Sequence, residues 1–378
     1  MGGKTTKPAT VFYLIAGEES GDHHGARLIK AIKTRIPQAS FFGHGGNQMS
    51  AAGMEISEHI DNLAVMGFTE VIKHLSYFKQ VMNETIAAIT KIRPDHIILI
   101  DYPGFNLRLA KKIAHLKIPV SYFILPQAWA WKEKRVKILR KYVKHSLSIF
   151  PFEESWYRQR AVTAQFVGHP FSEMESSGIS KSEFYNKHSL ASQDQLLVLF
   201  PGSRQQEVDR HWPVFLAAAQ KLIYQNPDLR LIVGKAPNIQ LDPLPPDLLI
   251  EEDNPRLALQ YGQLVLVASG TATLEAAVFN IPAIVAYRLS AITFFLARLI
   301  VDLPYIAMAN LIAGKKVVPE LLQTDLTEKN LIQAAMPLLV NSDEREKMQA
   351  EYQKIRQLLG APGAYARAAQ IIIGQPDG

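Results

Sequence analysis

The chain has 378 residues, enough for two domains of ordinary size, and 48% of them are apolar, so each domain can build a core. Its 41 lysines and arginines against 35 acids leave a charge of +6, which suits a nucleotide phosphate, an anionic lipid or RNA without choosing among them. The absence of cysteine excludes disulfides, thiolate chemistry and cysteine-bound zinc, and no apolar run is long enough to span a membrane.

The first half of the chain predicts an alternation of buried strands and helices. Strands are expected at 11–17, 40–43, 96–101 and 118–125, with two further short ones within 145–152 and 164–170. Helices are expected at 23–33, 69–91, 105–116 and 136–145. Apolar runs that are bounded by turn residues and separated by helices are typical of parallel βα units.

A polar stretch from about 171 to 193 marks a domain boundary, after which the same alternation begins again. Strands are expected at 195–200, 229–234, 264–269 and 283–287, helices at 207–224 and 271–279, and mostly helix from 327 onward. The prediction is an α/β protein with two Rossmann-like parallel-sheet domains and a cleft between them. Ligands of such sheets bind beyond the carboxyl ends of the strands.

The first strand runs into Gly17-Glu18-Glu19-Ser20-Gly21-Asp22. Glycines allow a ligand to approach the backbone closely, and the amides of the following helix start could bind an anion. The same letters also fit a plain turn in which Ser20 or Asp22 caps the helix. The segment matches neither the dinucleotide fingerprint nor a nucleophile elbow.

Asp101 follows the strand at 96–101, in the sequence Asp101-Tyr102-Pro103-Gly104-Phe105-Asn106. A carboxylate at the carboxyl end of a buried strand can accept a proton from a substrate hydroxyl. The alternative is that Asp101 caps the next helix or pairs with a nearby arginine.

Two tryptophans, Trp129 and Trp131, precede a strongly basic helix. This pattern fits an anionic membrane or a bound phosphate, but also a solvated helix face with both tryptophans in the core. The apolar segments 65–68 and 291–306 pose a similar choice between burial and contact with a membrane or an acyl chain.

The second half carries two candidate phosphate sites. Gly202, Ser203 and Arg204 follow a strand and could meet a diphosphate, or else Arg204 is a surface residue beside a helix cap. Residues 268–275 bring small hydroxyl side chains to a helix start, with Glu275 one turn further on, where it could bind a ribose. A capping arrangement is the alternative. No D-x-D and no H-E-x-x-H spacing is present, so we expect neither a metal nor a cofactor.

Ten segments together resemble the lipid-A-disaccharide synthase family. They occur in order along nearly the whole chain: GEESGD, LAVMGFTEVIKH, DYPGFN, PQAWAWKEKRV, FPFE, VGHP, FPGSRQQEV, ASGTATLEAAV, AYR and NLIAGKKVVPELLQ. The chain departs from the family pattern at Glu19, where alanine is frequent, and at Tyr102 and Gly104, where alanine and aspartate are common. An acid at position 104 therefore has no counterpart here.

The resemblance implies a GT-B fold and an inverting, metal-independent transfer. A UDP-diacylglucosamine donor would react with a diacylglucosamine 1-phosphate acceptor to give the β-1′,6-linked lipid A precursor and UDP. Residues 1–172 would bind the acceptor and residues 173–354 the UDP sugar, with the final helix, about 355–378, packing back on the first domain. The resemblance further implies a cytoplasmic protein held peripherally at the inner face of the bacterial inner membrane. It implies no nucleic acid as partner and allows a homodimer.

The resemblance also carries roles to individual positions. Asp101 would be the general base. The acceptor side would include Glu19, Ser20, Asp22 and Asn106. The donor side would include Ser203, Arg204, Ser269, Gly270, Thr271 and Thr273 at the diphosphate, Glu275 at the ribose, and Asn310, Glu320 and Gln323 near the sugar or diphosphate. His169 would act as a hinge or bond to the backbone.

Two other functions remain open from the sequence. A soluble UDP-N-acetylglucosamine 2-epimerase would share the fold without needing acyl chains. A non-catalytic protein that binds a nucleotide sugar or RNA would bind UDP without turnover and would not need Asp101.

Overall fold

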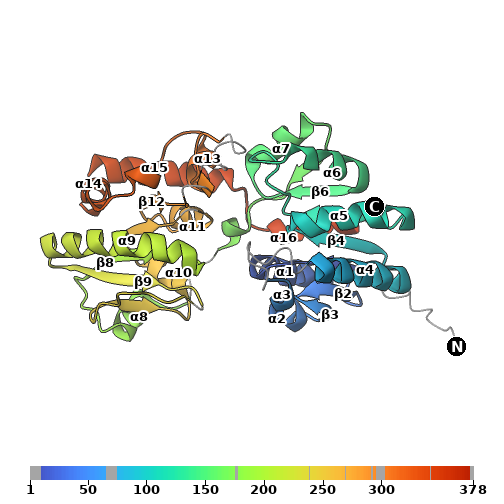
Figure 1. Ribbon diagram of the computed structural model, residues 1–378, viewed down its shortest axis with the longest axis horizontal. Coiled ribbons are helices and arrows are strands. Elements are labelled where there is room, and N and C mark those ends of the chain that lie inside the picture. Colours follow the sequence, from blue (N-terminus) through green and yellow to red (C-terminus); the bar gives the residue numbers. More distant parts are fainter. Residues whose placement is uncertain are drawn as a thin grey trace. The chain divides into compact units, whose positions relative to one another are not determined.

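The computed structural model describes residues 10–64, 75–174, 178–237, 239–268, 270–290, 293–294, 303–340 and 342–374. The chain divides into two compact units (Figure 1). The first consists of Met1–Pro170 together with Gly360–Gly378, and the second of Phe171–Leu359. The sequence had suggested a boundary after residue 172 and a return to the first domain at about 355.

The first unit is built on a seven-stranded parallel sheet in the order β3-β2-β1-β4-β5-β6-β7. The strands are β1 Val11–Ile15, β2 Ser40–Gly45, β3 Met54–His59, β4 His96–Ile100, β5 Val120–Phe123, β6 His145–Ser148 and β7 Ala164–Phe166. All five residues of β4 are buried, because helices cover both faces of the sheet.

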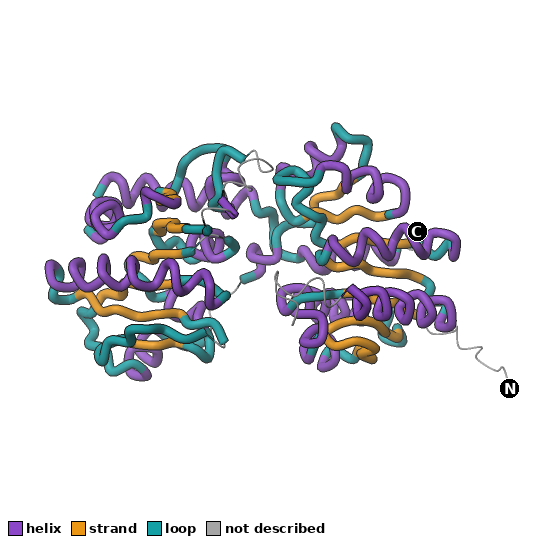
Figure 2. The backbone as a smooth tube through the Cα atoms, viewed as in Figure 1, coloured by secondary structure: helices purple, strands orange, loops and turns teal. Residues whose placement is uncertain are grey.

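The helices of the first unit are α1 Glu19–Arg35, α2 Asn47–Ala51, α3 Ile60–Ala64, α4 Leu75–Ile92, α5 Pro103–Ile113, α6 Val136–Tyr142, α7 Pro151–Arg158 and α16 Ala364–Ile373. Short 3-10 helices lie at Ala114–Leu116, Glu133–Arg135 and Pro170–Glu173. Helix α16 packs against α1, and its Tyr365 hydroxyl lies 2.8 Å from Nδ1 of His24. Figure 2 shows helices on both sides of the strands in each unit.

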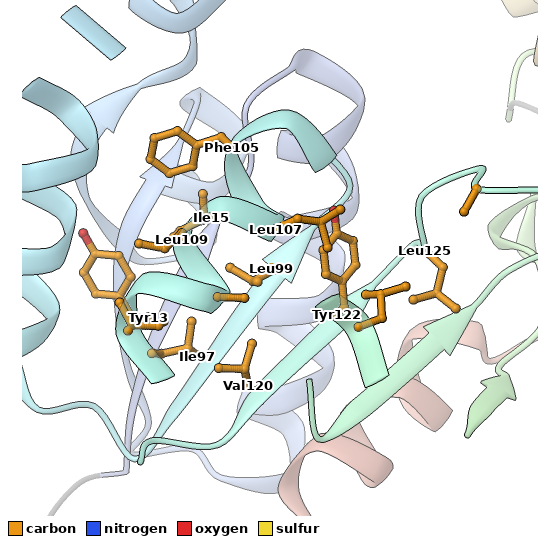
Figure 3. Close-up of a cluster of buried hydrophobic side chains, with 14 of the residues drawn as sticks. Tyr13, Ile15, Ile97, Leu99, Phe105, Leu107, Leu109, Val120, Tyr122 and Leu125 are labelled. Atoms are coloured by element: carbon orange, nitrogen blue, oxygen red, sulfur yellow. The ribbon is translucent and has the colours of Figure 1, made fainter. Parts of the chain in front are cut away.

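The core on one face of this sheet follows the two-residue period of the strands. Tyr13, Ile15, Ile97, Leu99 and Tyr122 are buried together there, and α4, α5 and α6 supply the facing apolar side chains (Figure 3). Tight packing on this face fixes the strand ends that carry the polar residues described below.

The second unit has a six-stranded parallel sheet in the order β10-β9-β8-β11-β12-β13. Its strands are β8 Gln195–Phe200, β9 Leu229–Gly234, β10 Leu249–Glu251, β11 Leu264–Val267, β12 Ala283–Tyr287 and β13 Glu320–Leu322. Its helices are α8 Lys181–Lys187, α9 Gln205–Gln225, α10 Pro255–Gln260, α11 Ala272–Val278, α13 Met308–Ala313, α14 Glu328–Leu339 and α15 Asp343–Leu358, with a 3-10 turn at Gln323–Asp325.

The predicted α/β class with two parallel sheets is confirmed. Several short elements were not predicted from the sequence, namely α2, α3, α7, α8, α10, α13 and the strands β3, β10 and β13. The three missed strands are edge strands, and most of their residues are exposed or only partly buried. They therefore lack the continuous apolar run that marks a central strand.

Within the part of the chain that the structure describes, no helix is long and apolar enough to cross a membrane. The segment 65–68 lies outside the described residues, as does 291–306 except for 293–294 and 303–306.

Candidate functional site

The turn after β4 places Asp101 at the carboxyl end of the sheet in an uncommon backbone conformation. Asp101 and Tyr102 both lie in the left-handed region, with φ of 44° and 48°. Such a conformation costs a non-glycine residue about 1–3 kcal/mol and persists only where surrounding contacts enforce it. The Tyr102 ring packs onto Gly17, where a Cβ atom would lie 2.3 Å from the ring. Gly17 is therefore required by this close contact.

Hydrogen bonds from two side chains hold the carbonyl of Asp101. The Asn106 amide nitrogen donates to the Asp101 carbonyl at 2.8 Å and lies 3.2 Å from the carbonyl of Ile100. The Tyr122 hydroxyl donates to the same Asp101 oxygen at 2.5 Å. The Asp101 amide itself donates to the carbonyl of Phe123 at 3.0 Å. These hydrogen bonds fix the backbone of Asp101 on both sides, and none of them involves its carboxyl group.

The electrostatic surroundings of Asp101 suit a base. Burial, and to a smaller extent the negative charge of Glu18, raise the pKa of the Asp101 carboxyl to about 6. The Tyr102 amide and the Arg135 guanidinium act in the opposite direction. At neutral pH the group is mostly ionised, and its pKa is close enough to neutrality for efficient proton acceptance.

A second buried acid, Glu153, lies near this turn and was missed by the sequence analysis. It is fully buried, and burial raises its pKa to about 8. The Trp129 indole donates to Glu153 Oε1 at 2.9 Å. Glu153 stands at the third position of α7, where its carboxyl group also accepts the Phe150 amide at 3.4 Å. An acid three residues after a helix cap is a recognisable capping signal, and here it also orients Trp129.

The acceptor-side candidates separate into exposed and buried residues. Glu19 and Ser20 are exposed at the start of α1. Asp22 is buried, and its carboxylate accepts the amides of Gly46, Gln48 and Met49 at 2.7, 3.0 and 3.0 Å. Asp22 thereby caps the start of α2. Asn106 is also fully buried and engaged with backbone carbonyls, so both residues act on the framework of the site.

In the second unit, Ser203 and Arg204 stand exposed before α9. Gly202 has a φ of 137°, and a Cβ atom there would lie 2.9 Å from Cβ of Glu207, so the turn requires glycine. Arg204 Nη1 lies 3.8 Å from Glu207 Oε1, and the arginine side chain is 78% exposed. A long ion pair at this exposure is weak, which leaves the guanidinium available for an anion.

The turn into α11 holds the other donor-side candidates. Gly270 has a φ of 122° with open space around it, and Thr271 is exposed. Thr273 is buried, and its hydroxyl donates to the Gly270 carbonyl at 3.0 Å. Ser269 lies outside the described residues.

Glu275 faces an arginine that the sequence analysis did not name. Its Oε1 atom accepts hydrogen bonds from Nε and Nη2 of Arg256 at 3.1 and 2.9 Å. Burial raises the pKa of the Glu275 carboxyl, while Arg256 opposes this shift. The guanidinium therefore sets the direction in which this nearly buried carboxylate points.

The side chains of Asn310 and Glu320 bond to each other and to backbone groups of the surrounding loop. The Asn310 side chain is fully buried. Its amide oxygen accepts hydrogen bonds from the Val317 and Val318 amides, and its amide nitrogen donates to the Val318 carbonyl and, at 2.8 Å, to Glu320 Oε1. Glu320 also accepts the Ala307 amide at 2.9 Å, at the start of α13. Gln323 is half-buried with a φ of 51°, and its carbonyl accepts Arg288 Nε at 3.2 Å. The side chains of Asn310 and Glu320 are thus engaged in holding the loop backbone, as is the Gln323 carbonyl.

No three histidine, aspartate or glutamate side chains gather into a metal site among the described residues. The ring of the buried His169 lies against that of Phe150 at a tilt of 41°, with ring centroids 5.3 Å apart.

Comparison of the sequence with known proteins gives a consistent result. The model of the lipid-A-disaccharide synthetase family matches residues 12–372. A lipid-A-disaccharide synthase of Acidobacterium capsulatum is 38% identical, covering 94% of this chain and 93% of the relative. The lipid-A-disaccharide synthase of Myxococcus xanthus is 36% identical, covering 97% and 98%.

Comparison with solved structures bears on the fold. The glycosyltransferase of kitacinnamycin has a TM-score of 0.65 at 15% identity, covering 97% of this chain and 99% of that one. The calicheamicin glycosyltransferase has a TM-score of 0.63 at 15% identity, covering 98% and 100%. A UDP-GlcNAc 2-epimerase of Neisseria meningitidis has a TM-score of 0.61 at 10% identity, covering 97% and 98%. The predicted GT-B fold is confirmed by these likenesses, which at such identities speak for the fold alone.

Proposed function

The chain belongs to the lipid-A-disaccharide synthase family of glycosyltransferases, which act in lipid A biosynthesis, and on this premise we propose its reaction. Diacylglucosamine is transferred from UDP to the 6-hydroxyl of diacylglucosamine 1-phosphate, giving the β-1′,6-linked disaccharide 1-phosphate and UDP. The observation that carries the proposal is family identity along nearly the whole chain, together with a carboxylate held at the end of β4.

On the acceptor side, Asp101 takes the proton of the 6-hydroxyl as the oxygen attacks the anomeric carbon of the donor. The new oxygen–carbon bond forms as the bond from the anomeric carbon to the diphosphate oxygen breaks. The proton ends on Asp101, UDP leaves with the bond's electron pair, and the attack inverts the anomeric centre. Asn106 and Tyr122 position the base through the Asp101 carbonyl, and Glu19 and Ser20 are exposed to contact the acceptor.

On the donor side, the departing diphosphate needs fixed positive charge and amide donors. The exposed Arg204 guanidinium supplies the charge, with Ser203 and the Gly270–Thr271 turn beside the polar start of α11. Glu275, oriented by Arg256, binds the ribose hydroxyls. Thr273, Asn310 and Glu320 shape these loops through their backbone contacts. The proposal assigns no metal ion to any step.

The lipid substrates imply work at a bilayer, and the first unit has a surface suited to it. Residues 103–144 contain eleven lysines and arginines and a single acid, Glu133. We define the α5/α6 basic face by its exposed cations Arg108, Lys111, Lys112, Lys134, Lys137, Arg140, Lys141 and Lys144. Anionic headgroups attract such a face. We propose peripheral association with the cytoplasmic face of the inner membrane through it.

The epimerase alternative rests on shared fold alone, at 10% identity for the Neisseria meningitidis enzyme. The synthase relatives align at 36–38% identity over nearly their whole length. A protein that only binds a nucleotide sugar would not need Asp101, so the Asp101→Asn variant below also separates that function from the proposed one.

The test is a radiochemical assay with labelled UDP-diacylglucosamine and diacylglucosamine 1-phosphate. We expect disaccharide formation by the wild type. We expect Asp101→Asn to lower kcat about a hundredfold or more, with the donor KM retained, because only proton removal is lost. Glu84→Gln, on the exposed side of α4, serves as the matched control. Equal activity on non-acylated sugars would remove the lipid function, and near-normal turnover of Asp101→Asn would place the base elsewhere.

A further inference from the structure

Two cations are stacked on one exposed tryptophan beside the Asp101 turn. Lys132 Nζ lies 4.3 Å and Arg135 Cζ 4.5 Å from the centroid of the Trp131 ring, which is 38% exposed. Lys132 has a φ of 57°, and its carbonyl accepts the Arg135 amide at 3.0 Å, so the chain folds back to bring both side chains to one ring. The two charges are therefore at most about 9 Å apart and repel each other, and an anion between them would relieve this repulsion.

Neither cation has an acid as its partner in the described part of the chain. Glu133, the one acid of residues 103–144, accepts Nε of Arg160 at 2.6 Å, and the Arg160 guanidinium stacks 3.8 Å from the centroid of Trp156. Arg135 is half-buried and makes no ion pair among the described residues. Asp101 attracts Arg135 without forming an ion pair with it. A partly desolvated guanidinium without an ion-pair partner favours binding of an anion.

Arg135 and Asp101 lie beyond the same edge of the sheet. Asp101 follows β4, and the segment that carries Lys132 and Arg135 follows β5, the neighbouring parallel strand. The charge of Arg135 acts on Asp101 and on the buried hydroxyls of Tyr122 and Tyr157. A sugar whose hydroxyl reaches Asp101 therefore lies at the edge of the sheet from which the segment with Lys132 and Arg135 also leaves. The acceptor of the proposed reaction carries one anionic substituent on that same ring, a phosphate monoester.

We infer that Lys132 and Arg135, stacked on Trp131, form the subsite for the phosphate group of the acceptor sugar. The inference rests on the proposed function. The planar guanidinium can form two parallel hydrogen bonds to phosphate oxygens, and the ammonium adds a second positive charge. Trp131 holds both side chains in place, which lowers the conformational entropy lost on binding. In the α5/α6 basic face, Lys141 contacts the Tyr142 ring at 5.4 Å, but no second cation shares that ring among the described residues.

The experiment compares two acceptors, diacylglucosamine 1-phosphate and its dephosphorylated counterpart, by kcat/KM. We expect the wild type to prefer the phosphorylated acceptor. In Arg135→Gln that preference should fall about 10- to 100-fold, the range for a lost charge-assisted hydrogen bond. Lys132→Gln should reduce it less, and Arg135→Lys should restore part of it. Any effect of Arg135 on the pKa of Asp101 acts on both acceptors alike and cancels in the ratio.

Arg93→Gln is the matched control, because Arg93 is an exposed arginine of the first unit outside the α5/α6 basic face, and it contacts no aromatic ring among the described residues. Its preference should equal that of the wild type. An unchanged ratio in both Arg135→Gln and Lys132→Gln overturns the subsite, as does a wild type that uses both acceptors equally well. If the wild type makes disaccharide from neither acceptor, the proposed function itself fails.

Discussion

Asp101 combines a strained backbone, partial burial and a neighbouring negative charge in one residue. Burial and Glu18 raise the pKa of its carboxyl to about 6, and Arg135 partly offsets them. A base is active in its deprotonated form. Activity should therefore be low below this pKa and rise as pH increases through it.

This gives a prediction for the pH profile of kcat/KM. The wild type should show an acid limb with a midpoint near pH 6 and a plateau above it. Glu18→Gln removes a charge that raises the Asp101 pKa, so the limb should move to lower pH. Initial rates across pH 4.5 to 8, roughly the range around that limb, measure the shift.

Glu84→Gln is again the control, since its carboxylate is not among the charges acting on Asp101. Its acid limb should coincide with that of the wild type. A limb that stays in place in Glu18→Gln, or moves upward, would contradict the assignment of the limb to Asp101.

At this same scale the sequence reveals a residue's position more readily than its contacts. The place of Asp101 follows from a buried apolar strand that ends in an acid. The contacts of Asp22 and Asn310 cannot be read from the sequence, because a polar residue in a motif can bind either a ligand or a backbone amide. Both side chains are engaged with backbone groups, which requires loops distant in sequence to be placed first. Arg256 was missed for the same reason, since its partner Glu275 lies 19 residues away.

At the scale of elements, β4, β5 and α5 meet to fix the conformation of the Asp101–Tyr102 turn. Asn106 lies in the first turn of α5 and reaches back to the end of β4, while Tyr122 reaches across from β5. Burial raises the pKa of the Tyr122 phenol well above its ordinary value, so it remains a donor across the working pH range. The strain of two left-handed residues is thus balanced by bonds from neighbouring elements.

Tyr122→Phe tests this balance by removing one hydrogen bond without changing the ring. The Asp101 carbonyl keeps its bond from Asn106, so we expect the protein to fold with the free energy of unfolding lowered by about 1 kcal/mol. Because the base loses part of its positioning, kcat should fall about tenfold with the donor KM unchanged. Steady-state kinetics and urea denaturation measure the two effects.

Tyr142→Phe, on the half-buried side of α6, is the matched control and should preserve kcat. A Tyr122→Phe protein that loses stability but keeps the wild-type kcat would show that the bond supports the fold alone.

The deeply buried strands were easier to predict from the sequence than the strands at the edges of the sheets. The central strands are buried on both faces and read as unbroken apolar runs, as in β4 and β11. The edge strand β3 has one buried residue at its start and a mixed pattern after it, so its apolar signal is weak. Helix α8 carried a usable signal that was overlooked: Ser180 and Glu183 form a capping box, with the Ser180 amide donating to Glu183 Oε2 at 2.7 Å.

At the scale of the molecule, the two units share a parallel α/β plan but differ in how their charge is distributed. The net charge of the chain is +6, yet residues 103–144 alone contribute eleven cations against one acid. None of the eight cations of the α5/α6 basic face makes an ion pair among the described residues, whereas Lys187, Lys235 and Lys315 of the second unit are each paired with acids. Such a concentration of unpaired cations is the basis for the proposed association with an extended anionic surface.

Vesicle binding tests whether that partner is an anionic bilayer. The variant Lys111→Gln, Lys112→Gln, Lys137→Gln, Lys141→Gln removes four charges of the basic face. Each lysine near an anionic surface contributes about 1 kcal/mol, so after salt screening we expect affinity for phosphatidylglycerol-containing vesicles to fall at least about 30-fold. Wild-type binding should be weak on purely phosphatidylcholine vesicles and should decrease as salt is raised. Co-sedimentation measures both effects.

The matched control removes four exposed cations of the second unit that make no ion pair with any described residue, in the variant Lys316→Gln, Lys329→Gln, Lys347→Gln, Arg356→Gln. Both variants have the same net charge. A difference in vesicle binding between them therefore reports where the removed charges lie and not how many were removed. If the basic face is the docking surface, the control binds vesicles nearly as well as the wild type. Equal losses of affinity in the two variants would mean that net charge alone attracts the protein to the vesicles. If the wild type bound anionic and neutral vesicles equally well, the α5/α6 basic face would be excluded as the membrane contact.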